Sequence, residues 1–97
     1  MHFVILALDA PDASSRRMDL KAEHLAYLEG RQSDLLAAGA VRDREGRAIG
    51  GLLILEAEGY DEAERFIAGD PYSTGEVFGT VQIFAWRQSF FQGQRLP

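Results

Sequence analysis

The sequence predicts an α+β domain with the element order βαββαβ. Three apolar segments have the length of strands, at residues 3–8, 49–58 and 77–87, and a shorter candidate strand lies at residues 40–44. Two helical segments separate these strands in a way that places both helices on one face of an antiparallel sheet. Because a chain of 97 residues has the size of one domain, we expect residues 1–97 to form a single domain.

The first strand is expected at Phe3–Leu8, which reads FVILAL and is followed by Asp9-Ala10-Pro11. Both alternating sets of its side chains are apolar, which is typical of a strand that is buried on both faces. The two helices cover only one face of the sheet, so the other face needs a second cover. The simplest cover is the same sheet of another copy, and we therefore expect a homodimer.

A long helix is expected over about residues 14–38, with Gly39 as its stop. Gly30 is a weak point at which this helix can bend. His24 lies in a broad apolar arc of the helix, together with Leu20, Leu25, Leu28, Leu35 and Leu36.

The second half of the chain supplies the remaining elements. The strand at residues 49–58 contains Gly50-Gly51, and a glycine pair inside a strand marks a bulge or a close approach to the backbone. A shorter helix is expected over residues 60–68. The last strand, Val77–Arg87, is expected to place one set of side chains on one face (Phe78, Thr80, Gln82, Phe84 and Trp86) and the other set on the opposite face (Val81, Ile83 and Ala85).

The composition argues against several classes of function. Ten basic and 15 acidic residues give a net charge of −5 without a compact basic cluster, so we expect no nucleic-acid partner. The absence of cysteine excludes disulfides and thiolate chemistry. The longest apolar runs are too short to span a bilayer, and the first residues lack the features of a signal peptide. We expect a cytoplasmic protein without a membrane partner.

His24 and Asp70 are the candidate catalytic residues. The helix turns His24 inward, and histidine titrates near neutral pH, as a general acid or base must. Asp70 precedes Pro71, which is typical of an N-cap before a short helical turn. The same carboxylate can orient an imidazole and fix its tautomer. From spacing alone, a structural histidine with one hydrogen bond and a purely capping aspartate remain open interpretations.

Other polar residues are weaker candidates. Tyr27, Arg31 and Tyr72 can supply polar contacts, and Asp9 can face the same cleft. The two histidines lack the spacing of a metal site, so neither a metal nor another cofactor is expected. The sequence contains no P-loop, no GxGxxG motif after a strand and no GxSxG motif, so phosphate cradles and serine-hydrolase chemistry are not predicted.

The spacing of several of these residues, together with the element order, resembles the sequence pattern of the YciI-like family. The resemblance rests on FVILALD, Arg17, His24-Leu25, Gly39-Ala40, Gly50-Gly51, Asp70-Pro71-Tyr72 with Gly75 and Val77, and Ala85-Trp86. It implies a ferredoxin-like domain that dimerises through its sheets, as in the dimeric α+β barrel proteins, and a cleft with a His–Asp pair. Members of such families resemble dehydrochlorinase-type lyases that act on small muconate-like acids.

The chain departs from the family pattern at two places. Gly39-Ala40 stands where Gly-Pro is often found, and Ala85-Trp86 stands where Pro-Trp or Pro-Phe is often found. These departures alter loop geometry rather than chemistry. A substrate preference therefore does not transfer with the resemblance.

We therefore expect a small dimeric acid–base enzyme, lyase-like or dehydrochlorinase-like, that acts on a small organic acid without a cofactor. His24 is the expected acid or base, and Asp70 orients it. Arg17 is expected to anchor a substrate carboxylate, which guanidinium binds bidentately, and Tyr72 is expected to contact the substrate. The alternative is a non-catalytic small-ligand-binding or accessory protein with the same cleft. A heme- or oxygen-handling protein with His24 as the ligand is a third interpretation.

Overall fold

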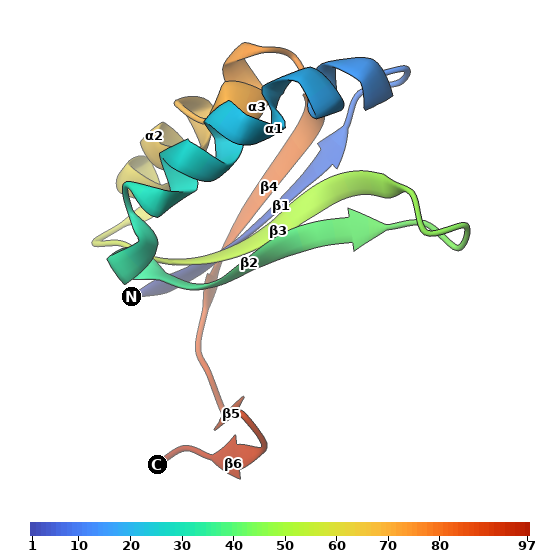
Figure 1. Cartoon of the computed structure of the whole chain (residues 1–97). Helices are drawn as coiled ribbons and strands as arrows, with labels where there is room; N and C mark the ends of the chain where they lie inside the picture. Colours follow the sequence, from blue (N-terminus) through green and yellow to red (C-terminus); the bar gives the residue numbers. More distant parts are fainter.

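The computed structural model describes all 97 residues and has two layers, an antiparallel sheet and helices on one of its faces (Figure 1). The four-stranded sheet has the order β2-β3-β1-β4. The βαββαβ order and the antiparallel sheet predicted from the sequence are confirmed. The elements are β1 (His2–Asp9), α1 (Ser14–Glu29), the 3-10 helix η1 (Gln32–Asp34), β2 (Leu35–Arg42), β3 (Ala48–Glu56), α2 (Tyr60–Ala68), α3 (Pro71–Thr74), β4 (Phe78–Trp86), β5 (Phe90–Phe91) and β6 (Gln94–Arg95).

The main core lies between the helices and the sheet. Alternate residues of β1 point into it, and Phe3 and Ile5 pair in register with Leu55 and Leu53 of β3. Burial of each such large side chain contributes roughly 1.5–3 kcal/mol to stability. The cluster consists of Phe3, Ile5, Leu53, Leu55, Ala57, Ala63, Phe66 and Ile67.

The second face of the sheet has no helix over it, and the β5–β6 hairpin extends away from the sheet on that side (Figure 1). This open face carries the other alternating set of side chains, among them Val4, Leu6, Leu52, Ile54, Phe84 and Trp86. Leu52 is 41% exposed and Phe84 is 54% exposed. The sheet is therefore apolar on both faces, as the sequence predicts. None of the helices combines the length and the apolar composition of a membrane-spanning segment.

Helix α1 is much shorter than the sequence predicts. It ends at Glu29, where the backbone N–H of Gly30 donates to carbonyls of the last turn. Residues 35–38, expected to be helical, belong to β2, and Gly39 lies inside this strand rather than at a helix end. A short apolar run fits a helix or a strand by periodicity alone. Here the pairing of β2 with β3 satisfies backbone groups of the segment and decides its conformation.

Strand β4 contains a bulge that changes the face of one residue. Leu8 pairs with Thr80, but Asp9 pairs with Phe78, so Gly79 is the extra residue. The alternation along the strand is shifted there, and Phe78 packs against the buried clusters beneath the helices. The prediction that Phe78 shares a face with Thr80 and Phe84 is wrong for this reason.

The glycine pair of β3 is a place of close backbone approach, as predicted. A Cβ atom at Gly50 would lie 2.5 Å from the carbonyl oxygen of Ala7, whereas the nearest neighbour of a Cβ atom at Gly51 would be 3.8 Å away. We expect Gly50→Ala to lower the free energy of unfolding by about 1–3 kcal/mol, because the added methyl group meets backbone atoms. Gly51→Ala is the matched control and should change it by less than about 0.5 kcal/mol. Equal urea midpoints for the two variants would contradict this expectation.

Candidate functional site

Helix α1 and the start of α3 bring His24 and Asp70 into direct contact. Nδ1 of His24 lies 2.9 Å from each carboxylate oxygen of Asp70. The Asp70 side chain is fully buried, and the His24 side chain is 15% exposed. An ionised carboxylate only accepts hydrogen bonds, so Nδ1 carries the proton in this contact. Nε2 is then the ring nitrogen that is left for another partner.

The position of Asp70 is fixed by its role at the start of α3. Asp70 is the N-cap of this helix, Pro71 follows at its first position, and Oδ1 of Asp70 accepts a hydrogen bond of 2.9 Å from the backbone N–H of Tyr72. The predicted cap is confirmed. One carboxylate therefore caps the helix and binds the imidazole at the same time.

Tyr72 holds the plane of the His24 ring. The two rings are stacked, with 3.9 Å between their centroids and 8° between their planes. The hydroxyl of Tyr72 donates to the carbonyl oxygen of Arg17 at 3.2 Å. Burial raises the pKa of Tyr72, while the Arg17 guanidinium opposes this shift. The phenol therefore stays neutral at physiological pH and keeps its proton for this hydrogen bond.

Arg17 lies beside the pair but is already bound to a carboxylate. Its Nε and Nη2 donate to Asp9 at 2.8 and 3.0 Å, and its guanidinium lies over the Tyr72 ring at 4.7 Å. The hydrogen bond with Asp9 raises the pKa of Arg17, so the guanidinium is charged. The guanidinium group that was predicted to bind a substrate carboxylate is thus already bound, through two of its nitrogens, to Asp9. Nη1 is the nitrogen that remains for a ligand.

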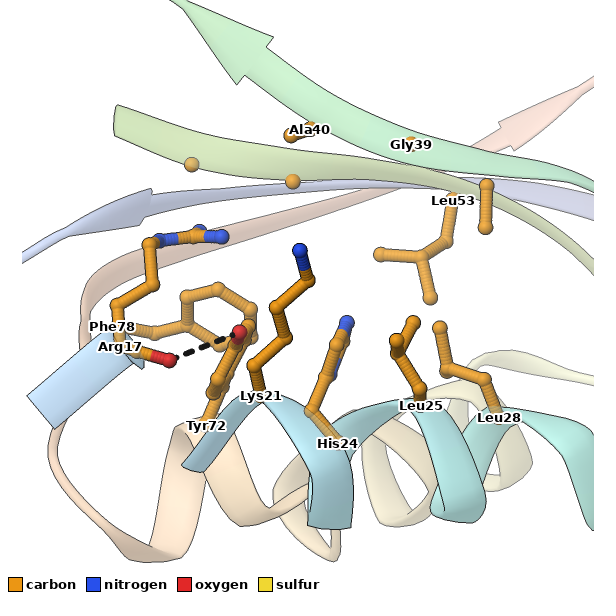
Figure 2. Close-up of a pocket in the computed structure, with 13 residues that line it drawn as sticks. Arg17, Lys21, His24, Leu25, Leu28, Gly39, Ala40, Leu53, Tyr72 and Phe78 are labelled. Atoms are coloured by element: carbon orange, nitrogen blue, oxygen red, sulfur yellow. Dashed lines mark hydrogen bonds between the residues drawn. The ribbon is translucent and has the colours of Figure 1, made fainter. Parts of the chain in front are cut away.

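A pocket of about 140 Å³ opens between α1 and the strands β2 and β3 (Figure 2). An apolar cavity of about 150 Å³ accommodates benzene, so a single ring fits here. Small residues of β2 and β3 form the side opposite α1, and Figure 2 shows His24 and Lys21 extending from α1 towards these strands. The lining residues are Arg17, Lys21, His24, Leu25, Leu28, Ala38, Gly39, Ala40, Gly50, Gly51, Leu53, Tyr72 and Phe78.

Three of the weaker candidates, Asp9, Tyr27 and Arg31, do not line this pocket. The hydroxyl of Tyr27 donates to the carbonyl oxygen of Phe66 at 2.7 Å. Arg31 forms ion pairs with Asp34 and Glu62. No group of three or more His, Cys, Asp or Glu side chains is arranged to hold a metal ion.

The sequence did not lead us to predict Lys21 or the residues of β2 as parts of the pocket. Lys21 follows Arg17 by four residues and precedes His24 by three, a spacing that places all three on one face of a helix. This spacing could have identified Lys21. The residues of β2 could not be identified, because this segment was expected to continue the first helix.

Comparison with known proteins gives the family. The profile of the YCII-related domain matches residues 1–87. An uncharacterized protein of Haemophilus influenzae (strain ATCC 51907 / DSM 11121 / KW20 / Rd) is 31% identical over 98 residues, which cover 93% of this chain and 100% of the relative.

A solved structure resembles the whole fold. It is 5-chloro-2-hydroxyhydroquinone dehydrochlorinase (TftG) from Burkholderia phenoliruptrix AC1100 in complex with 2,5-dihydroxybenzoquinone, with a TM-score of 0.83 and 31% identity. The match covers 90% of this chain and 94% of that one. The ferredoxin-like fold class and the YciI-like resemblance are confirmed, and the chain belongs to the YCII-related family.

Proposed function

We propose that this protein is a small-molecule enzyme in which His24 transfers a proton and Asp70 orients its ring. The observation that carries the proposal is the contact of Nδ1 with a fully buried carboxylate. This contact leaves Nε2 on the edge of the ring that extends into the pocket (Figure 2). A histidine held in this way is poised to act as a general base.

The proposed reaction is an elimination from a small cyclic acid. Nε2 takes a proton either from a carbon next to the chlorinated carbon or, in the keto form of a hydroxylated ring, from a hydroxyl group conjugated with it. The electron pair that is released forms a C=C or C=O double bond, and a chloride or similar anion leaves from the tetrahedral carbon that carries it. The ring of His24 becomes a cation in this step, and the carboxylate of Asp70 stabilises it at 2.9 Å. The similarity to a dehydrochlorinase at 31% identity supports this class of reaction.

The pocket supports a ligand of one ring. Its volume of about 140 Å³ suits a single six-membered ring, and leucine side chains of α1 and β3 supply apolar contacts. Arg17 and Tyr72 are proposed to contact this ligand through Nη1 of the guanidinium and the edge of the phenol ring.

The proposal is tested by turnover that depends on His24. Wild-type protein and His24→Gln are incubated with 5-chloro-2-hydroxyhydroquinone and with a panel of chlorinated single-ring acids, and chloride release is measured. We expect release by the wild type, and a rate at least about 100-fold lower for His24→Gln. Asp43→Asn is a suitable control, because Asp43 lies in the turn after β2 and does not line the pocket.

The second candidate is a non-catalytic binding protein. It is favoured by the lining of the pocket, in which His24 is the only side chain of the His, Cys, Asp and Glu types. Ligands that raise the melting temperature but are recovered unchanged from the wild type across the whole panel would establish this function instead.

The proposed functional unit is a homodimer formed through the open face of the sheet. Bulky side chains lie on β4 at one side of this face, where Phe84 is 54% exposed. A hollow of about 210 Å³ lies over β2 and β3 at the other side, lined in part by Ala37, Gly39, Val41, Leu52 and Ile54. In this dimer the open faces of the two copies meet, and the two-fold axis lies between them, parallel to the strands. This symmetry places β4 of one copy over β2 of the other. The large side chains then meet the hollow.

A further inference from the structure

The charged side chains that line the pocket are basic. Arg17 and Lys21 line it together with the titratable His24, and no Asp or Glu does so. The chain as a whole has a net charge of −5, so the pocket differs from the average surface. Two carboxylates beside the site, those of Asp9 and Asp70, each contact a basic group that lines it, Arg17 and His24 respectively.

Lys21 differs from the other two basic groups because it has no partner within the chain. Asp9 balances Arg17, and Asp70 faces His24, whereas Lys21 takes part in none of the ion pairs of the structure. Figure 2 shows its ammonium extending from α1 into the space between the Arg17 and His24 side chains. The cavity therefore contains one cation that forms no ion pair with a carboxylate of the protein.

We propose that Lys21 binds an ionised oxygen of the ligand and makes the pocket selective for anionic ring compounds. The proposal rests on the proposed function only for the place of the ligand, beside Nε2 of His24. Removal of a proton by His24 adds negative charge to a substrate, and an unpaired ammonium in the same cavity stabilises that charge. Leu25, Leu28 and Leu53 line the same cavity and supply apolar contacts for the ring of such a ligand.

The ionised oxygen can belong to a carboxylate or to an enolate or phenolate, and two pairs of probes separate these sources. The first pair is 2,5-dihydroxybenzoquinone, whose hydroxyl groups are vinylogous acids and ionise at neutral pH, and its neutral dimethyl ether. The second pair is 2,5-dihydroxybenzoate and its neutral methyl ester. Dissociation constants are measured by calorimetry at low ionic strength for the wild type, Lys21→Met and Lys21→Arg.

We expect Lys21→Met to weaken the binding of at least one anionic probe by about tenfold, which corresponds to about 1.4 kcal/mol. Its neutral partner should bind within about twofold of the wild type, because it has no charge for the ammonium to stabilise. Lys21→Arg should retain most of the affinity, since it keeps the positive charge. If the quinone pair shows this loss of affinity, Lys21 binds an enolate-type oxygen, and if the benzoate pair shows it, Lys21 binds a carboxylate.

Arg44→Met is the matched control, because it also removes one positive charge but lies in the exposed turn after β2 and outside the pocket. It should leave all affinities unchanged. The proposal is overturned if Lys21→Met weakens both members of each pair equally, if it weakens neither, or if the wild type binds none of the probes. A failure of the proposed function has a different signature: the anionic probe binds in a Lys21-dependent way, but no compound is turned over in a His24-dependent way.

Discussion

Asp70→Asn should lower kcat by about 1000-fold or more while the protein still folds. The amide oxygen of asparagine can still accept the hydrogen bond from the backbone N–H of Tyr72, which keeps the cap of α3. The amide nitrogen then faces Nδ1 of His24 at the position of Oδ2 and can donate a hydrogen bond to it. This contact favours the tautomer that carries the ring proton on Nε2, and in that tautomer Nε2 can no longer accept a proton from a substrate.

Two measurements check this expectation. The turnover rate gives the loss in kcat, and ¹⁵N NMR of the histidine ring gives the tautomer directly, with the proton on Nδ1 in the wild type and on Nε2 in the variant. Asp43→Asn is the control for loss of a carboxylate that also accepts backbone hydrogen bonds. An Asp70→Asn variant with the wild-type rate or the wild-type tautomer would show that Asp70 does not orient His24 for catalysis.

Phe84→Glu should convert the proposed homodimer into a monomer, with a dissociation constant at least about 1000-fold above that of the wild type. Phe84 projects from the open face of the sheet and is 54% exposed in the single chain. A carboxylate at this position would be buried against apolar side chains of the second copy, which costs several kcal/mol unless a partner is present. Sedimentation over a range of concentrations measures the change, since a dimer has twice the chain mass of 10.8 kDa.

Met18→Glu is the control for the added charge. Met18 lies on α1, on the opposite side of the sheet from the open face, and is 78% exposed. This variant should sediment like the wild type. A wild-type protein that is monomeric at all concentrations, or a Phe84→Glu variant that remains dimeric, would rule out the proposed interface.

The strands that carry a strong local pattern could be predicted from the sequence. Residues 3–8 alternate between two apolar faces and form β1, and Gly50-Gly51 correctly marked a close approach within β3. The end of the first helix could not be predicted, because Leu35 and Leu36 also fit the apolar arc of a continued helix. Pairing with β3 decides their conformation, and such pairing connects residues that are distant in the sequence.

The candidate site, too, could be predicted only where local sequence patterns determine it. The capping role of Asp70 follows from its position before Pro71, and the inward direction of His24 follows from helical spacing. The bond between Arg17 and Asp9 could not be predicted, because it depends on how the loop after β1 enters α1. This bond changes what Arg17 can offer to a ligand, and it makes Lys21 the basic residue of the pocket without a partner.

Helix α3 has only four residues, Pro71–Thr74, and the side chains at its start hold His24 in place. Any local opening of this short segment removes the carboxylate that binds Nδ1 and the ring that stacks on the imidazole at the same moment. The fraction of molecules competent for proton transfer therefore cannot exceed the fraction in which this segment is closed. The backbone amide of Tyr72 is protected by its hydrogen bond to Asp70, so its rate of hydrogen exchange reports that fraction. The same rate therefore measures how often His24 is held in position for proton transfer.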